Sequence, residues 1–403
     1  MESIQNNWSR RKFIFTMGGA GAFVLINPFS SWTFANNSED EVAKIVARTF
    51  GIDTHNHIDV PLNLAELPGP KLDLMGEIKK SGLSGIVMTF AVDYQKLTRE
   101  GEAYERFLNG LTAMDNVLES NAMKRALNLA DLQAAKESKK PIVIQSVEGG
   151  HFLEGKIERL EVAYKRGLRH LGLLHDNDSS VPLGDVFTNP PKWGGLTTFG
   201  ADVVKECERL GILVDLSHCD DNTINGALKI ATKPVLVSHT GLNTRLGNNE
   251  LMSKMMRPRL ISEAQAKIVA EKGGVIGVWT HLAESPTEFA ANIKAMVDIV
   301  GIDHVAIGTD TKMTPAYHSP NDNWGQNQGK PKSEGNVNND NKPKQENKRH
   351  AEKTTNTNWE NQKRGFYYTV VEALLKAGFN EKEIGKIGGG NYCRIFDEAT
   401  KRR

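Results

Sequence analysis

Eight short apolar runs, often rich in β-branched residues, recur between residues 50 and 310, separated by stretches with helical periodicity. They are Phe50–Asp53, Ser84–Phe90, Pro141–Val147, Leu168–Leu174, Ile212–Leu216, Pro234–Ser238, Gly274–Trp279 and His304–Gly308. Near-continuous apolar runs are typical of parallel strands buried on both faces. Segments such as Ala201–Leu210 and Ser262–Lys272 predict the helices between them. The pattern predicts an α/β protein with a (β/α)8 TIM barrel.

An open, doubly wound sheet is the structural alternative to the barrel. Such sheets often carry a Gly-x-Gly-x-x-Gly turn after the first strand, and the first run here, Phe50–Asp53, has none. The absence of this turn favours the barrel.

The first 35 residues have the pattern of an export signal. Arg10 and Arg11 precede an uncharged apolar stretch over residues 16–29, and the small residues Thr33 and Ala35 suit a signal peptidase. Paired arginines resemble a twin-arginine signal; an ordinary secretory signal and an uncleaved anchor are the alternatives. We therefore expect an exported, periplasmic or extracytoplasmic bacterial protein, with residues 36–403 forming one domain.

A second unusual segment lies at about residues 321–361, with 11 Asn and only four apolar residues, Trp324, Val337, Ala351 and Trp359. Such a composition buries too little apolar surface to offset the entropy of ordering. We expect a mobile insertion in the barrel, either a simple solvated loop or a lid.

Composition narrows the classes of function. The 403-residue chain has 50 basic and 49 acidic residues, which argues against nucleic acid as a partner. The three cysteines, Cys207, Cys219 and Cys393, form no C-x-x-C pair, which argues against a disulfide scaffold or a cysteine-built zinc site.

Histidines and carboxylates follow six of the eight runs, and they include an H-x-H pair. They are His55, His57, Glu148, His175, His218, His239 and Asp310. The carboxyl ends of barrel strands share one mouth, where the chemistry of such barrels sits. Imidazoles and carboxylates together suit Zn²⁺ or a similar divalent ion. The pattern therefore predicts a metal site at this mouth.

The spacing of these residues suggests two ions. His55 and His57 face the same side of an extended strand and can share one ion. His218 and His239 come from adjacent strands and can complete a second site, with Glu148 bridging the two. Two cations about 3.5–4 Å apart would hold a bridging hydroxide at neutral pH.

Several motifs resemble the membrane dipeptidase family (renal dipeptidase, peptidase M19) of the amidohydrolase superfamily. They are Val147-Glu148-Gly149-Gly150-His151, Val214-Asp215-Leu216-Ser217-His218, Val237-Ser238-His239, Gly273-Gly274-Val275-Ile276-Gly277-Val278, Ile307-Gly308-Thr309-Asp310 and Gly389-Gly390-Asn391-Tyr392-Cys393-Arg394-Ile395-Phe396. The resemblance implies a metallo-dipeptidase with two divalent ions, Zn²⁺ first among them, that hydrolyses dipeptides with a metal-bridging hydroxide.

The resemblance also implies roles for single residues. His55 and His57 would bind the first ion, His218 and His239 the second, and Glu148 both. His175 would polarise the scissile carbonyl and stabilise the oxyanion. Arg259 would clamp the substrate's terminal carboxylate, a task that suits a guanidinium, with Arg257 as its rival. Asp310 would move the proton between water and the leaving amine.

The chain departs from the family at one ligand, because the family usually has H-x-D where this chain has His55-x-His57. A neutral imidazole in place of a carboxylate changes the charge around the first ion. An amidohydrolase acting on another small amide, a β-lactam or a lactone therefore stays an alternative, as does a catalytically decayed metal-binding protein. The sequence does not say whether the chain forms a homodimer.

Overall fold

The structure, a computed structural model, describes residues 39–187, 190–319, 353–360 and 362–401. The chain divides into two units, Met1–Glu41 and Val42–Arg403. Only residues 39–41 of the first unit are described, so the expected export signal at 1–35 lies outside the described residues. The second unit contains every strand named below.

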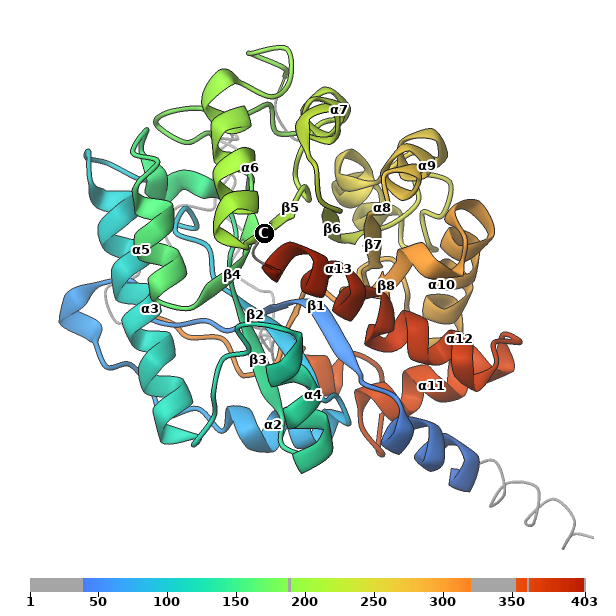
Figure 1. The fold of residues 1–403 in the computed structure, drawn as a ribbon. Coiled ribbons are helices and arrows are strands. Elements are labelled where there is room, and N and C mark those ends of the chain that lie inside the picture. Colours follow the sequence, from blue (N-terminus) through green and yellow to red (C-terminus); the bar gives the residue numbers. More distant parts are fainter. Residues whose placement is uncertain (1–38, 188–189, 320–352, 361, 402–403) are drawn as a thin grey trace, which may run out of the picture. The chain divides into compact units, whose positions relative to one another are not determined.

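Eight parallel strands close into a barrel, as the sequence predicted (Figure 1). They are β1 (Ile52–His57), β2 (Gly85–Thr89), β3 (Ile142–Val147), β4 (Leu168–Gly172), β5 (Leu213–Asp215), β6 (Leu236–Thr240), β7 (Val275–Val278) and β8 (Val305–Ile307). The order runs from β2 to β8, and β1 pairs with both β8 and β2 to close the ring. The (β/α)8 prediction is confirmed.

Helices surround the barrel and alternate with its strands (Figure 1). They are α2 (Leu74–Ser81), α3 (Glu102–Ser120), α4 (Leu129–Ser138), α5 (Arg159–Lys165), α6 (Thr198–Leu210), α7 (Asp221–Ile230), α8 (Glu250–Met256), α9 (Glu263–Glu271), α10 (Pro286–Val300), α11 (Phe366–Lys376), α12 (Glu381–Gly385) and α13 (Asn391–Thr400). Side chains cap many of their first turns. Thr197, Asp220 and Ser262, for example, accept the third backbone N–H of α6, α7 and α9.

The amino-terminal end of the barrel is closed by α13, which crosses the ring in Figure 1. Its Tyr392 and Phe396 are fully buried in an apolar cluster with strand residues such as Leu213, Leu236 and Val275. This packing fills one end of the barrel with hydrocarbon, so polar chemistry is left to the opposite end, where the strands finish.

Strand β1 differs from its predicted extent, because it continues to His57 rather than ending at Asp53. The sequence did not predict a further short strand, β9 (Thr311–Lys312), which pairs with β1 at Asn56 and His57. Both histidines of the H-x-H pair therefore lie within a strand that has partners on either side, and their spacing is fixed by the sheet.

The C-terminal part of the expected insertion is packed against the barrel. Residues 320–352 and 361 lie outside the described residues, but 353–360 carry a short 3-10 helix, Thr355–Thr357. The Nδ2 of Asn56 donates to Thr355 Oγ1 at 2.8 Å, and Trp359 donates through its indole to the carbonyl of Ala283 at 2.9 Å. Asn-rich composition concealed these two anchors, of which Thr355 contacts the strand that carries the H-x-H pair and Trp359 contacts the segment after β7.

Within the described residues, no helix has the length and apolar character that crossing a membrane requires.

Trp359→Ala tests whether this segment belongs to the fold. Trp359 is 5% exposed and stacks on Phe366, so we expect the free energy of unfolding to fall by about 3–5 kcal/mol. Denaturant unfolding measures the loss. Trp193→Ala is the control, because that side chain is 40% exposed; equal stability losses in the two variants would contradict the packing of residues 353–360.

Candidate metal centre

Four imidazoles meet tip to tip at the carboxyl ends of the strands. The Nε2 atoms of His55 and His57, both on β1, lie 3.1 Å apart. The Nε2 atoms of His218, after β5, and His239, on β6, lie 3.0 Å apart. The two pairs of nitrogen donors are 161 or more positions apart in sequence, and they meet as expected from strands that end at one mouth.

Glu148 stands between the two pairs. It follows β3 directly and is 3% exposed. Its Oε1 lies 2.9 Å from His218 Nε2 and 3.5 Å from both His55 and His239; its Oε2 lies 3.5 Å from His57 and 3.4 Å from His175. Apart from these imidazoles, neither oxygen has a hydrogen-bond partner in the described part of the chain. A buried carboxylate in this state needs positive charge beside it, and a cation fits that need.

The electrostatics separate the imidazoles into two classes. Burial lowers the pKa of His239 to about 4 and that of His55 well below its usual value, so both rings are neutral. Burial also opposes the charged form of His218, but the carboxylates of Glu148 and Asp176 raise its pKa to about 10. Without a cation, the centre holds a proton at His218 to balance Glu148.

Two ligand candidates adopt a left-handed backbone, which is uncommon for residues other than glycine. His218 has φ 64° and Asp310 has φ 54°. These turns follow β5 and β8, where the chain leaves its strand and directs the next side chain over the mouth. Such backbone strain is typical of functional sites.

Two positions inside the barrel, Gly277 and Gly308, have no room for a side chain. A Cβ on Gly277 or Gly308 would lie 1.9 or 1.8 Å from the carbonyl oxygen of Ser238. That oxygen instead accepts a hydrogen bond from Thr54 Oγ1 at 2.7 Å. The two glycines therefore let β6 sit close to β1, which sets His239 against His55, with ring centroids 3.9 Å apart.

One hydroxyl orients an imidazole from each pair. Ser238 Oγ donates to Asp215 Oδ2 at 2.6 Å, and its oxygen accepts from the Nδ1 of His239 at 2.9 Å and of His55 at 3.3 Å. Protons on both Nδ1 atoms leave both Nε2 lone pairs for a cation. Asp215 in turn accepts from the buried His170 at 3.2 Å.

The remaining imidazoles each have a different outer partner. The Nδ1 of His57 lies 2.8 Å from the hydroxyl of Tyr94, that of His175 lies 2.6 Å from Asp93, and that of His218 lies 2.9 Å from Asp176. Sequence reasoning missed Tyr94, Asp93, Asp176 and Ser238 as partners. Of the carboxylates that lie beside the ligands in sequence, Asp215 reaches the imidazoles through Ser238, whereas Asp53 accepts from Thr309 and Asp59 pairs with Lys312.

Asp310 contacts the first pair of histidines with one carboxylate oxygen and a further histidine with the other. Its Oδ1 lies 3.3 Å from the Nε2 of His57 and 3.7 Å from that of His55, close enough for the three to share one ion. Its Oδ2 accepts from His281 Nε2 at 2.8 Å. Burial opposes the charged form, but His239 and His281 hold the pKa of Asp310 well below its usual value. Sequence reasoning gave Asp310 only an acid/base role and did not place His281 in the site.

Arg259 reaches the centre through a carboxylate. It lies in the 3-10 helix Arg257–Arg259 after α8, and its guanidinium pairs with Asp176, the partner of His218. Its backbone carbonyl accepts from Thr240 Oγ1 at 2.8 Å, which ties the loop to β6. Arg257, considered as a rival, is exposed and has no such contact with Asp176 among the described residues.

Other candidates lie outside the cluster of ligand atoms. His151 bonds to the carbonyl of Asn177 at 2.8 Å, and His304 bonds to that of Gly274 at 2.8 Å. Cys219 is buried, and no group of metal-ligand atoms among the described residues includes it. The two histidines therefore have partners in the backbone outside the centre.

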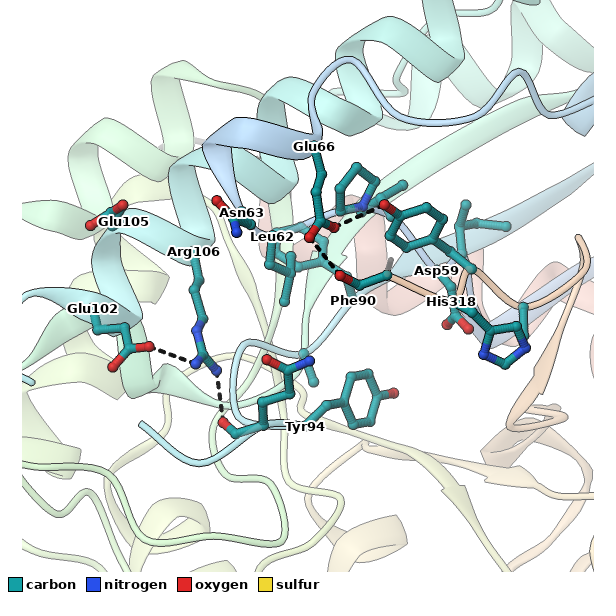
Figure 2. Close-up of a pocket in the computed structure, with 18 of the residues that line it drawn as sticks. Asp59, Leu62, Asn63, Glu66, Phe90, Tyr94, Glu102, Glu105, Arg106 and His318 are labelled. Atoms are coloured by element: carbon teal, nitrogen blue, oxygen red, sulfur yellow. Dashed lines mark hydrogen bonds and ion pairs between the residues drawn. The ribbon is translucent and has the colours of Figure 1, made fainter. Parts of the chain in front are cut away.

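A cavity of about 490 Å³ adjoins the centre on the side of His57. Tyr94, whose hydroxyl contacts His57, lines it together with loops after β1, β2 and β9. Figure 2 shows the Arg106–Glu102 pair on one side, His318 on the other, and Glu66 accepting two hydrogen bonds above. The lining mixes paired charges with apolar residues such as Leu62 and Phe90.

Comparisons with known proteins show similarity in sequence and in fold. An uncharacterized protein in the pqqA 5′ region of Klebsiella pneumoniae is 25% identical over 202 residues, 47% of this chain and 71% of that protein. The probable dipeptidase PvdM from Pseudomonas aeruginosa has a TM-score of 0.67 at 16% identity, covering 91% of this chain and 100% of that one. A metallopeptidase from Rhodobacter sphaeroides, liganded with a phosphinate mimic of the dipeptide L-Ala-D-Ala, has a TM-score of 0.61 at 16% identity, covering 87% and 99%.

The solved structures are similar in fold, and the family assignment comes from the sequence. The model of the membrane dipeptidase family matches residues 39–319, more than half of the chain. This span holds every ligand candidate described above. The resemblance drawn from the motifs is confirmed, and the chain belongs to the membrane dipeptidase family, peptidase family M19.

Proposed function

We propose that this chain is a metal-dependent dipeptidase that binds two divalent cations, with Zn²⁺ the best-suited ion. The observation that carries the proposal is the buried carboxylate of Glu148, which lies within 3.5 Å of five imidazoles and has no other hydrogen-bond partner among the described residues. His55, His57 and Asp310 would hold one ion, His218 and His239 the other, and Glu148 would contact both. Bound cations of this kind make hydroxide available from water near neutral pH and act as Lewis acids.

The chain's own residues supply the rest of the chemistry. Asp310 is ionised and can accept the proton of the attacking water, because His281 holds one oxygen and leaves the other toward the centre. It can then pass that proton to the leaving amine; positioned acid–base groups contribute about 10²–10⁴-fold to rate. The Nδ1 of His175 bonds to Asp93, which leaves its Nε2 toward the centre, where it can contact the carbonyl oxygen of the substrate.

The substrate would lie across the mouth. Arg259 stands on the side of β4–β6, where its guanidinium suits a terminal carboxylate. The 490 Å³ cavity opens on the opposite side, beside β1 and β2, and offers room for the amino-terminal residue. A dipeptide carries a carboxylate on one side of its amide and the amino-terminal residue on the other. Arg259 and the cavity lie on two sides of the centre in the same way, which supports a dipeptide over a lactone. The Rhodobacter relative, which holds a dipeptide mimic, is consistent with this class of substrate.

A substrate panel tests the activity. We expect the purified, metal-loaded chain to hydrolyse dipeptides, and to act on lactones, β-lactams and other small amides far more slowly. The panel includes L- and D-residues at the carboxyl position. Glu148→Gln keeps the shape of the side chain but removes its charge, so turnover should fall about 100-fold or more.

The outcomes of the panel separate three functions. Preference for lactones or β-lactams would favour the wider amidohydrolase class. Bound metal without hydrolysis of any compound would favour a metal-binding protein whose catalysis has decayed. Glu148→Gln with unchanged turnover would remove that carboxylate from the reaction.

Metal affinity should depend on pH through His218. The pKa of this imidazole is raised to about 10, so below that pH a cation must displace its proton. The proton stabilises the metal-free fold at low pH, and this stabilisation is lost as pH rises toward 10. We therefore expect metal affinity to rise about tenfold per pH unit between about pH 6.5 and 9. Competition with a chelator at constant ionic strength measures this, and a flat profile would contradict it.

Export remains a proposal about residues 1–35. We expect Arg10→Lys with Arg11→Lys to abolish export, because a twin-arginine signal requires the arginines. Fractionation of bacterial cells that express the full chain measures this, with Lys12→Arg as a control that keeps the pair. Unchanged export of the double variant would indicate an ordinary secretory signal instead.

A further inference from the structure

The side chain of Asp176 joins two parts of the site that have separate tasks. Its Oδ1 accepts from the Nδ1 of His218 at 2.9 Å, and its Oδ2 pairs with the guanidinium of Arg259. The three residues come from different segments, after β4, after β5 and in the 3-10 helix that follows α8. One carboxylate therefore contacts both an imidazole of the proposed metal centre and the arginine proposed to bind substrate.

Asp176 occupies the guanidinium of Arg259, which is the group proposed to bind a substrate carboxylate. A guanidinium presents a planar fork that matches one carboxylate at a time in two-point geometry. The side chains of Arg259 and Asp176 are 25% and 32% exposed, so a small molecule entering the mouth can reach the pair. An arriving carboxylate must then displace Asp176 or share the arginine with it, against the repulsion of the two negative charges.

We propose that Asp176 is a positioning residue that holds Arg259 as an internal stand-in for the substrate carboxylate, and that the site thereby selects against weakly bound carboxylates. The inference rests on the proposed function of Arg259. The competing role is simpler: Asp176 would only anchor His218, and its pairing with Arg259 would have no effect on the substrate. Both roles use the same side chain, so the test must separate its two oxygens.

Two substitutions make that separation. Asp176→Asn keeps an oxygen that can accept from His218 but removes the negative charge that holds Arg259. Asp176→Ala removes both contacts. Asp178→Asn is the matched control, because Asp178 lies two residues further along the same loop and pairs with Lys192 instead.

The readout is the KM of a dipeptide compared with that of the same dipeptide as its C-terminal amide, both measured with the metal-loaded full chain. We expect Asp176→Asn to lower KM for the free dipeptide by about two- to fivefold, as for loss of a partly exposed ion pair. KM for the amide, which has no carboxylate to compete for Arg259, should not change. The ratio of the two values should not move in Asp178→Asn.

Metal affinity gives a second readout that does not depend on activity. Asp176→Ala should weaken metal binding by about 10- to 100-fold, because it removes the acceptor that orients His218, whereas Asp176→Asn should weaken it less. Competition with a chelator measures both values.

Three outcomes would overturn the inference. They are an unchanged KM ratio in Asp176→Asn, a raised KM for the free dipeptide, or an equal change for both compounds. Absence of hydrolysis by the wild-type chain would instead be a failure of the proposed function. Calorimetric titration of the same proteins with the same two compounds then decides the inference, since tighter binding of the free dipeptide alone in Asp176→Asn would still support it.

Discussion

A negative charge buried at the centre of a protein needs positive charge or hydrogen-bond donors around it, and the carboxylate of Glu148 is the group that imposes this requirement here. Five imidazoles lie within 3.5 Å of its oxygens, which have no other hydrogen-bond partner among the described residues. The burial would be costly without a compensating cation or proton. The surrounding features of the site follow from this one constraint.

The closed barrel satisfies the requirement by bringing strand ends together. Glu148, His218 and His239 come from the ends of β3, β5 and β6, which share one mouth. Each imidazole is also held at its outer nitrogen, so its inner nitrogen faces the carboxylate. The opposite end is closed with apolar side chains from α13, which leaves the mouth as the polar end of the barrel.

The sequence predicted the barrel, the family and the meeting of the ligand candidates at one mouth. Buried strands have a strong apolar signal, and the residues that follow parallel strands of a closed barrel lie at the same end of it. It could not predict the outer partners. Tyr94, Asp93 and Asp176 lie in loops where polar residues are ordinary, and only the fold brings them to an imidazole. The Asn-rich composition of residues 321–361 likewise concealed the buried Thr355 and Trp359, because an average over a segment hides two anchoring residues within it.

The single hydroxyl of Ser238 contacts an imidazole from each pair, and this has a consequence for divergence within the family. A substitution at Ser238 would disturb both halves of the centre at once, so it offers no route to adjusting one half alone. His57 is different, since its outer partner is a tyrosine from a separate loop. A substitution at His57 can therefore alter one half of the centre while the contacts of Ser238 with His55 and His239 stay intact.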